Sequence, residues 1–488
     1  MEGYKHGAYV REVKAKINTP AENAAGIHVV FGTAPVNMAE EPEKAVNRLV
    51  VAEDFEEAKK KLGYSEDFGK FTLCQAMDAY FKIFSVGPVA FCNVLDPGKH
   101  KKQNGEKECR VEGMQVVLEE EGIIQSSLEV KTAEGTKLIK EEDYIASFDN
   151  EGKMVVTLFS SGKGAEAEKL VISSESIAPE MVGEADIIGG ADVETGEEAG
   201  MELVRRVYPV CGRYPGCIMA PGWSHKKNVA AVMAQKSLEI NGVFRCECLV
   251  DLDTELAGRH TECGKVKEES GMVDPQTIAL WPMAKAGGRK YYYSAVFGAM
   301  MAWEDAENDG IPCASPSNKL LRIDSAVLAD DTEVNLDLPE ANMLNGQGIV
   351  TILNSEGMRS WGNNTAAYPY LEDVKEEIND RWVNCRRAFS WWGNSFIATC
   401  RKRVDSPANY RLIETIVDEE NIRGNSYVQQ GKFAGARMEY DKYENGVDSI
   451  MEGRIVVRQY LAPYTPAEYI LNILSFDPSL LENALGGN

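Results

Sequence analysis

The first 22 residues carry a weak alternation of apolar and polar positions that ends at Thr19-Pro20. So few apolar side chains cannot form a core, because ordering one residue costs about 1–2 kcal/mol of conformational free energy. We therefore predict that residues 1–22 form an extended N-terminal arm. Its apolar residues are Tyr4, Tyr9, Val10, Val13 and Ile17.

Residues 23–95 predict the first part of an α/β core. Continuous apolar runs at 27–32 and 89–95 are typical of buried strands, and the segment 73–84 has a helical pattern. Residues 96–182 differ, because short alternating strands are separated by turn residues such as Asp149-Asn150-Glu151-Gly152. This spacing predicts an inserted antiparallel β domain, a small sandwich or barrel.

Residues 183–367 return to alternating helices and apolar strands, which predicts a largely parallel sheet covered by helices. Residues 368–476 predict a C-terminal α+β domain, followed by a tail at 477–488. Strands are expected at 454–461 and 469–476. A helix is expected at 371–389, where apolar residues recur every three or four positions. These residues are Leu371, Val374, Ile378, Trp382, Cys385 and Phe389.

Composition agrees with a multidomain α/β protein. The chain has 488 residues, of which 44% are hydrophobic and 26% charged, so three or four compact units are expected. The formal net charge is −24, and the short basic runs at 59–61, 99–102 and 401–403 lie among acidic residues. Because a nucleic-acid-binding surface needs clustered positive charge, we expect no nucleic-acid partner.

Targeting signals are not evident in the sequence. No window approaches about 18 consecutive apolar residues, so we expect no membrane span and no membrane partner. The N-terminal Met1-Glu2-Gly3-Tyr4 sequence begins no apolar signal segment. The odd number of cysteines, 11, favours reduced thiols in a cytoplasm.

Candidate catalytic groups are sparse. Ser224 and His225 are sequence neighbours, but no G-x-S-x-G motif surrounds a serine. We interpret Ser224 as the N-cap of the following helix, and we predict no catalytic residues. A hydrolytic enzyme remains the alternative, and it would require a serine or cysteine within hydrogen-bond reach of a histidine.

Metal and cofactor sites are not predicted either. Cys211, Cys217, Cys246, Cys248, His260 and Cys263 lie close in sequence but lack the C-x₂₋₄-C spacing of structural zinc sites. The sequence Ile187-Ile188-Gly189-Gly190 lacks both a dinucleotide fingerprint and a Walker lysine, so a tight turn is expected there.

Three stretches resemble the contractile tail sheath family of phages and phage-tail-like particles. One is His6-Gly7-Ala8-Tyr9-Val10 with Gly26-Ile27-His28-Val29-Val30-Phe31-Gly32. Family members often carry Pro-Gly-Val-Tyr where this chain has His6-Gly7-Ala8-Tyr9, which is a departure from the family pattern. The second is Leu344-Asn345-Gly346-Gln347-Gly348-Ile349 with Trp361-Gly362-Asn363-Asn364-Thr365. The third is Gly453-Arg454-Ile455-Val456-Val457 with Pro466-Ala467-Glu468-Tyr469-Ile470. The resemblance covers most of the chain, and the region around 96–180 is its least recognisable part.

The resemblance implies a structural subunit without enzymatic activity, whose middle domain has a subtilisin-like fold. It also implies a homopolymer of hexameric rings stacked around an inner tail tube protein, with baseplate and tail terminator proteins as further partners. Contraction of the sheath would drive the tube into a target cell. Extended arms would add strands to neighbouring subunits, with Tyr4, Tyr9, Val10, Val13 and Ile17 as the inter-subunit arm and Ile455, Val456, Val457 and Tyr460 as the acceptor strand.

In the family a helix of this domain faces the tube, so the resemblance implies that the charged side of helix 371–389, with Arg386 and Arg387, is the candidate tube-facing surface. An ordinary solvated helix face is the alternative for these two arginines. The sequence leaves open whether the particle is an infectious phage or a phage-tail-like bacteriocin. A rival function, besides the hydrolytic enzyme, is a soluble host binding protein with an inserted β domain. That protein would be a compact monomer with ordered termini.

Overall fold

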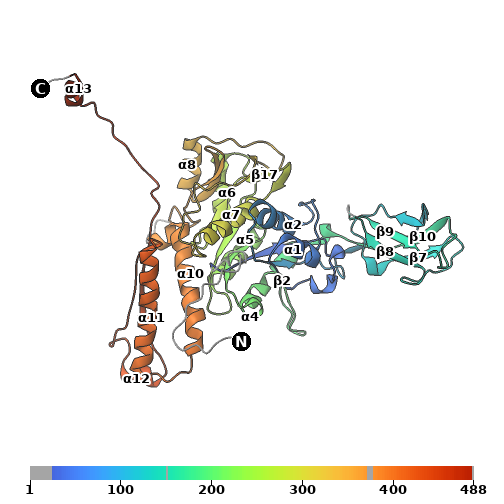
Figure 1. Ribbon diagram of the computed structural model, residues 1–488, viewed down its shortest axis with the longest axis horizontal. Helices are drawn as coiled ribbons and strands as arrows, with labels where there is room; N and C mark the ends of the chain where they lie inside the picture. The colour runs from blue at the N-terminus through green and yellow to red at the C-terminus, as the bar shows by residue number, and fades with distance from the viewer. Residues whose placement is uncertain (1–24, 150–151, 371–376, 486–488) are drawn as a thin grey trace, which may run out of the picture.

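The computed structural model describes residues 25–149, 152–370 and 377–485. The described chain is elongated, with a central α/β body, a β domain at one end and long C-terminal helices at the other (Figure 1). The final segment leaves the body and ends in the short helix α13 (Pro478–Ala484).

An eight-stranded sheet forms the centre of the body, in the order β2-β3-β1-β14-β15-β16-β20-β21. The six inner strands are parallel to their neighbours, whereas the two edge strands β2 and β21 are antiparallel. All residues of β1 and β3 are buried, because helices cover both faces of a parallel sheet. The strands are β1 (Ile27–Gly32), β2 (Leu49–Ala52), β3 (Val89–Asn93), β14 (Pro215–Met219), β15 (Glu247–Asp251), β16 (Thr277–Leu280), β20 (Ile349–Asn354) and β21 (Met358–Trp361).

The central helix α7 (Tyr293–Glu307) is almost wholly apolar and buried in the principal hydrophobic core. Two helices of the body begin at capping aspartates: Asp54 accepts a hydrogen bond from the backbone N–H of Glu57 at the start of α1, and Asp337 accepts one from Glu340 at the start of α8. The remaining helices of the body are α1 (Phe55–Leu62), α2 (Thr72–Met77), α3 (Glu184–Ile188), α4 (Val207–Cys211), α5 (Lys227–Leu238), α6 (His260–Glu269) and α8 (Leu338–Gly346), with 3-10 or π turns at Val36–Met38, Pro42–Lys44, Asp78–Ile83, Gln125–Ser127, Pro179–Met181 and Gly200–Arg206. Two smaller antiparallel groups, β12–β13 and β18–β17–β19, complete the body with β12 (Gly190–Ala191), β13 (Glu198–Ala199), β17 (Met283–Ala286), β18 (Arg289–Tyr291) and β19 (Ser325–Val327).

The β domain consists of two three-stranded antiparallel sheets, β5-β10-β7 and β6-β9-β8, joined to the body by the pair β11–β4. Its strands alternate buried and exposed positions, and the buried side chains form a cluster separate from the main core. The strands are β4 (Lys101–Gln103), β5 (Lys107–Arg110), β6 (Gln115–Val117), β7 (Glu129–Thr132), β8 (Tyr144–Phe148), β9 (Met154–Leu158), β10 (Lys169–Ser173) and β11 (Glu175–Ile177).

The C-terminal region combines two long helices with one hairpin. Trp391, Trp392, Tyr427 and Phe433 form its aromatic core, and the Trp392 and Phe433 ring centroids are 5.2 Å apart. The elements are α9 (Ile378–Arg381), α10 (Val383–Cys400), α11 (Tyr410–Gln429), β22 (Phe433–Glu439), α12 (Val447–Met451) and β23 (Arg458–Pro463), with a 3-10 turn at Arg401–Arg403.

Two sequence predictions are wrong in this region. The continuous helix expected at 371–389 is instead the short α9 followed by α10, and Leu371 and Val374 lie outside the described residues. The strand expected at 469–476 is absent from the described chain, because this segment pairs with no other strand and is exposed throughout. No partner strand for this segment lies in the described part of the chain.

Candidate functional site

Ser224, Asp251 and Ser294 meet at the carboxyl edge of the central sheet. The Ser224 hydroxyl donates to Asp251 Oδ2 at 2.9 Å and accepts from the Asp251 backbone N–H at 3.1 Å. Ser294 donates to the same carboxylate through its hydroxyl, at 2.5 Å, and through its backbone N–H, at 2.8 Å. The predicted N-cap role of Ser224 is therefore wrong, since α5 begins only at Lys227.

The neighbouring His225 does not join this cluster as a base. Its ring stacks on Tyr292 with 5.5 Å between the ring centroids, and burial lowers the pKa of His225. Burial also raises the pKa of Asp251 to about 6, against the opposing hydrogen bonds from Ser294 and Ser224. Across residues 25–149, 152–370 and 377–485, no hydrogen bond joins a serine or cysteine to a histidine. The cluster ties strand ends to α7, and it does not have the geometry of an activated nucleophile.

The cysteines are free thiols, and most of them are buried. Burial raises the pKa of Cys246 and Cys248, which keeps both as neutral thiols. No group of three or more histidine, cysteine, aspartate or glutamate side chains in the described chain could hold a metal ion.

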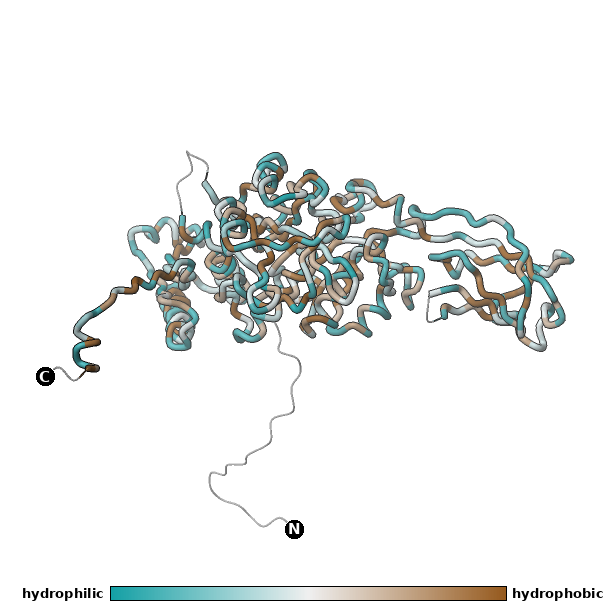
Figure 2. Tube along the Cα trace, turned by 90° about the horizontal axis from the view of Figure 1, so that it is seen from above, coloured by the Kyte–Doolittle hydropathy of each residue, from teal (hydrophilic) through white to brown (hydrophobic). Residues whose placement is uncertain are grey.

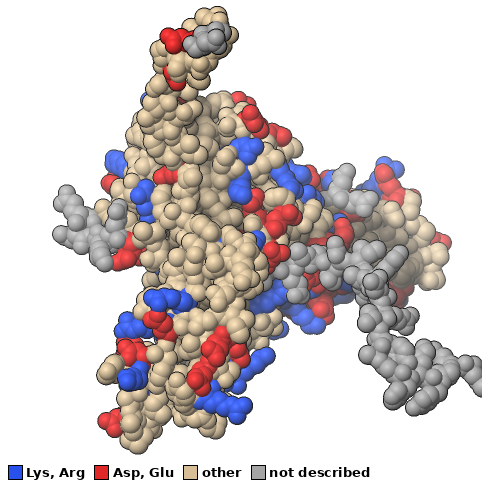
Figure 3. All heavy atoms as spheres, turned by 60° about the vertical axis from the view of Figure 1, so that its left-hand side comes forward, with Lys and Arg blue, Asp and Glu red and all other residues tan. Residues whose placement is uncertain are grey.

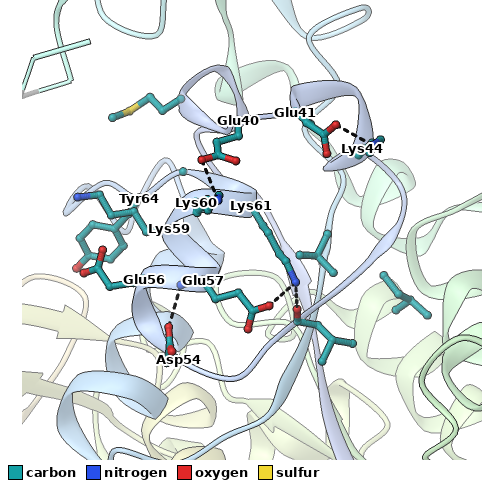
Figure 4. Close-up of a pocket in the computed structure, with 15 residues that line it drawn as sticks. Glu40, Glu41, Lys44, Asp54, Glu56, Glu57, Lys59, Lys60, Lys61 and Tyr64 are labelled. Atoms are coloured by element: carbon teal, nitrogen blue, oxygen red, sulfur yellow. Dashed lines mark hydrogen bonds and ion pairs between the residues drawn. The ribbon is translucent and has the colours of Figure 1, made fainter. Parts of the chain in front are cut away.

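A hollow of about 960 Å³ beside α1 is lined by charged side chains that pair with one another (Figure 4). Lys61 donates to Glu57 at 2.6 Å and to the Val51 carbonyl at 2.8 Å, and Lys60 lies 3.2 Å from Glu40. The Val51 carbonyl belongs to the edge strand β2, so Lys61 occupies an acceptor on the free edge of the central sheet. The side chain of Lys61 therefore takes up a carbonyl that an added strand could otherwise use.

The exposed apolar surface of this chain is concentrated in the C-terminal tail, which we define as residues 465–485. Tyr469 and Phe476 are each 79% exposed, and Figure 2 shows the brown, hydrophobic stretch of this segment away from the body. A monomer seldom exposes so many neighbouring apolar side chains, and such a surface usually marks an interaction site. The exposed apolar residues of the tail are Tyr469, Ile470, Leu471, Ile473, Leu474, Phe476, Leu480, Leu481 and Leu485.

The sheet β22–β23 is the nearest counterpart of the predicted acceptor strand. It has two strands only, so each has an edge without a partner in the described chain. Tyr460 lies in β23, whereas Ile455, Val456 and Val457 precede it, so the predicted strand 454–461 is displaced toward the C-terminus. The Asn445 side chain holds this preceding segment, because its amide bonds both the N–H and the carbonyl of Val456.

The prediction that Arg386 and Arg387 form an exposed tube-facing surface is wrong. Their exposed fractions are 7% and 3%, because α10 packs against the body with its charged side as well as its apolar side. Arg386 pairs with Asp380 at 2.8 Å, and Arg387 forms a bidentate pair with the buried Asp305 of α7. The predicted arm residues Tyr4, Tyr9, Val10, Val13 and Ile17 lie outside the described residues.

On the tail-bearing side of the molecule, acidic and basic side chains are interspersed with one another around broad uncharged areas (Figure 3). None of the helices within the described ranges is long and apolar enough to cross a membrane.

Together, the described chain combines a mixed α/β fold with several sheets and an exposed apolar tail. No profile of a known protein family matches the chain. Sequence relatives are nevertheless found over its whole length: it is 22% identical over 501 residues to the tail sheath protein of Burkholderia phage BcepMu, and the match covers 99% of both chains. It is 28% identical over 151 residues to the major tail sheath protein of Serratia phage KSP20, covering 30% of this chain and 36% of that protein.

Solved structures agree in fold. The PVC sheath complex of an extracellular contractile injection system, in the contracted state, contains a chain with a TM-score of 0.56 and 14% identity, covering 98% of this chain and 99% of that chain. A chain of the anti-feeding prophage baseplate has a TM-score of 0.56 and 13% identity, covering 96% and 98%. These findings confirm the resemblance to contractile tail sheath proteins. The matched relatives are structural proteins and not enzymes, which confirms the prediction of a non-enzymatic subunit.

Sequence reasoning missed two buried residues of this region, Asp305 and Asn384. Asp305 ends an apolar helix and pairs with Arg387, which lies 82 residues later. Asn384 joins three segments through its side-chain amide. The signal that could have found them is a polar side chain within an otherwise apolar helical stripe, because such a residue needs a buried partner.

Proposed function

We propose that this chain is the subunit of a contractile tail sheath, assembled in the bacterial cytoplasm as stacked hexameric rings around an inner tail tube. In this proposal the sheath also contacts baseplate and terminator proteins, and its contraction drives the tube into a target cell. The observation that carries the proposal is the C-terminal tail, whose apolar side chains are mostly exposed in the single chain.

The sequence of the tail suggests how it docks. In an extended segment, successive side chains point to opposite sides. Ile470, Leu474 and Phe476 then lie on one side of the tail, and a matching apolar row lies on the other. That second row is Tyr469, Leu471 and Ile473. A strand with apolar side chains on both sides is typical of a strand covered on both faces. The docked tail is therefore expected to lie between two layers of a second copy.

The sheet β22–β23 of the second copy is the proposed acceptor. An added strand gains main-chain hydrogen bonds at an edge such as that of β23, while side-chain pockets provide specificity. The helices α10 and α11 cover one face of this hairpin, since Phe433 and Met438 are buried beneath it. Repeating the contact from copy to copy builds a polymer, because a head-to-tail interface that does not close on itself propagates.

The parallel central sheet supports the proposal of a subtilisin-like middle domain that is kept for architecture. The carboxyl edge of this sheet, where enzymes of α/β folds place their ligands, is occupied by the hydrogen-bonded cluster around Asp251. A fold used in this way illustrates that fold alone does not determine activity.

Negative-stain microscopy of the purified full-length protein over a range of concentrations tests the proposal. We expect rings, tubes or long polymers, and we expect the inner tube protein to increase their length when the two are expressed together. A protein that stays monomeric at every concentration, with and without the tube protein, would overturn the proposal and favour a soluble binding protein.

A further inference from the structure

The segment Trp361–Thr365 lies at the point where the C-terminal tail leaves the body. It borders a hollow of about 580 Å³ whose lining also includes Arg381 and the first tail residues, Pro466 to Tyr469. Figure 1 shows the tail departing close to the start of α10. The sequence of this segment belongs to the stretches that resemble tail sheath proteins, yet it contributes no group to a catalytic or metal site.

Asn384 connects this segment to the root of the tail. Its side-chain carbonyl accepts a hydrogen bond from Asn363 Nδ2 at 2.9 Å. Its Nδ2 donates to the Tyr464 carbonyl at 2.9 Å and to the Cys313 carbonyl at 3.2 Å. Asn384 is 2% exposed, so every polar group of its amide is used within the protein. The backbone of the tail root is thereby fixed to the Asn363 loop.

Arg381 makes the second connection. Its guanidinium lies 4.5 Å from the Tyr368 ring centroid and 4.2 Å from the Trp382 ring centroid, and its Nε donates to Asn364 Oδ1 at 3.2 Å. Its Nη2 lies 3.6 Å from Glu468 Oε2 in the tail. The rings and Asn364 hold the guanidinium in one orientation, so the carboxylate of Glu468 meets a charge whose position is already set.

Beyond these contacts the tail is free of the body. Among the described residues 465–485, the Glu468–Arg381 pair is the single ion pair to the rest of the chain, and the hydrogen bonds of the tail stay within the tail. A segment tethered only at its root explores many directions, which lowers its effective concentration at any one acceptor. Fixing the root reduces the ordering cost of docking.

We propose that Trp361–Thr365 forms a socket that sets the direction in which the C-terminal tail leaves the body, with Asn384 and Arg381 as its positioning residues. The socket favours docking of the tail on a second copy by orienting it before contact. This consequence for assembly rests on the proposed sheath function, whereas the orientation of the tail in a single subunit does not.

The test compares Arg381→Ala and Glu468→Ala with the control Glu482→Ala, which removes a carboxylate from the exposed helix α13 of the same tail. The first measurement is the distance distribution between a label at position 479 of the tail and a label at position 418 of α11, below the concentration at which the protein assembles. We expect a broader distribution in Arg381→Ala and Glu468→Ala and an unchanged one in the control. The second measurement is the concentration needed for polymerisation, which we expect to rise severalfold in the two variants alone.

A distribution as narrow in Glu468→Ala as in the wild type would overturn the socket. Glu468 is exposed, so this variant keeps the test decisive even if Arg381→Ala fails to fold. If the wild-type protein does not polymerise, the proposed function fails, but the distance measurement still decides whether the root is oriented.

Discussion

Arg387 of α10 and Asp305 of α7 form a bidentate ion pair inside the protein, with Arg387 Nη1 donating to Asp305 Oδ1 at 3.1 Å and Nη2 donating to Oδ2. Burial raises the pKa of Asp305, and Arg387 opposes that shift. Nearby, the buried Glu247 accepts a hydrogen bond of 2.7 Å from Ser390 of the same helix. Polar side chains of α10 are therefore paired with buried carboxylates of the body. These contacts hold α10 on the α/β domain.

We predict that Arg387→Ala lowers the free energy of unfolding by about 3–5 kcal/mol, because it leaves Asp305 buried without its partner. Chemical denaturation of the monomer measures this loss. The control Arg454→Ala removes an exposed arginine and should change stability by less than about 0.5 kcal/mol. Replacing both partners, in Arg387→Met with Asp305→Leu, should recover much of the loss. A single-variant loss below about 1 kcal/mol would contradict the role of the pair.

The stability of the protein should depend on pH through Asp251. Its folded-state pKa of about 6 lies above its ordinary value of 3.8, so the folded state binds the proton more tightly than the unfolded state. The resulting penalty on folding is fully present above pH 6 and decreases as the pH falls toward 3.8. Between pH 7 and pH 5 this group should contribute a gain of about 1–1.5 kcal/mol.

Asp251→Asn removes this titration while keeping a side-chain acceptor for Ser224 or Ser294. The difference in unfolding free energy between the wild type and the variant, measured at pH 7 and at pH 5, isolates the contribution of Asp251. A difference that stays constant between the two pH values would show that Asp251 titrates normally in the folded state.

Polymerisation should depend on both sides of the tail. Ile473→Asp and Leu474→Asp place a charge on opposite sides, and each should abolish or strongly weaken polymer formation, because burying an unpaired charge is costly. Asn472→Asp, at the polar position that precedes Ile473, should be tolerated better. Sedimentation and microscopy provide the measurement. Full assembly by either Ile473→Asp or Leu474→Asp would indicate a strand with one face in solvent. Monomer stability should not change, since these side chains are exposed.

Removal of residues 1–20 should abolish polymerisation while leaving the thermal stability of the monomer nearly unchanged. Monomer stability should not change because the few apolar side chains of the N-terminal arm cannot offset its own ordering cost of about 1–2 kcal/mol per residue. A fully extended arm of 22 residues reaches roughly 70 Å, enough to contact a neighbouring subunit. A shortened protein that still forms long polymers, or one that no longer folds, would assign the arm another role.

A broad serine- or cysteine-hydrolase probe should not label the native protein. Ser224 donates its hydroxyl hydrogen to a carboxylate instead of to a histidine, and the buried cysteines remain protonated. Labelling is measured by intact mass, with a denatured sample as the control for accessible thiols. Stoichiometric labelling of the native protein that disappears in Ser224→Ala would contradict this expectation.

The amino-acid sequence alone was sufficient to locate buried strands such as 27–32 and 89–95, because continuous apolar runs are typical of a sheet covered on both faces. It also carried the resemblance to tail sheath proteins, since the order of several short motifs survives low overall identity. The helix around Cys385 was recognisable by its period, although α10 continues to Cys400, beyond the end predicted at Phe389.

Which polar residues are buried and which apolar residues are exposed became evident only from the packing of the folded chain. Arg387 looks like an exposed charge in a helical pattern, and its burial follows from Asp305, which comes from a distant helix. The segment 469–476 looks like an ordinary strand, yet the described chain offers it no neighbouring strand. Local periodicity records the preference of a segment for burial, whereas the partner that provides the burial is set by the packing of remote segments or by a second molecule.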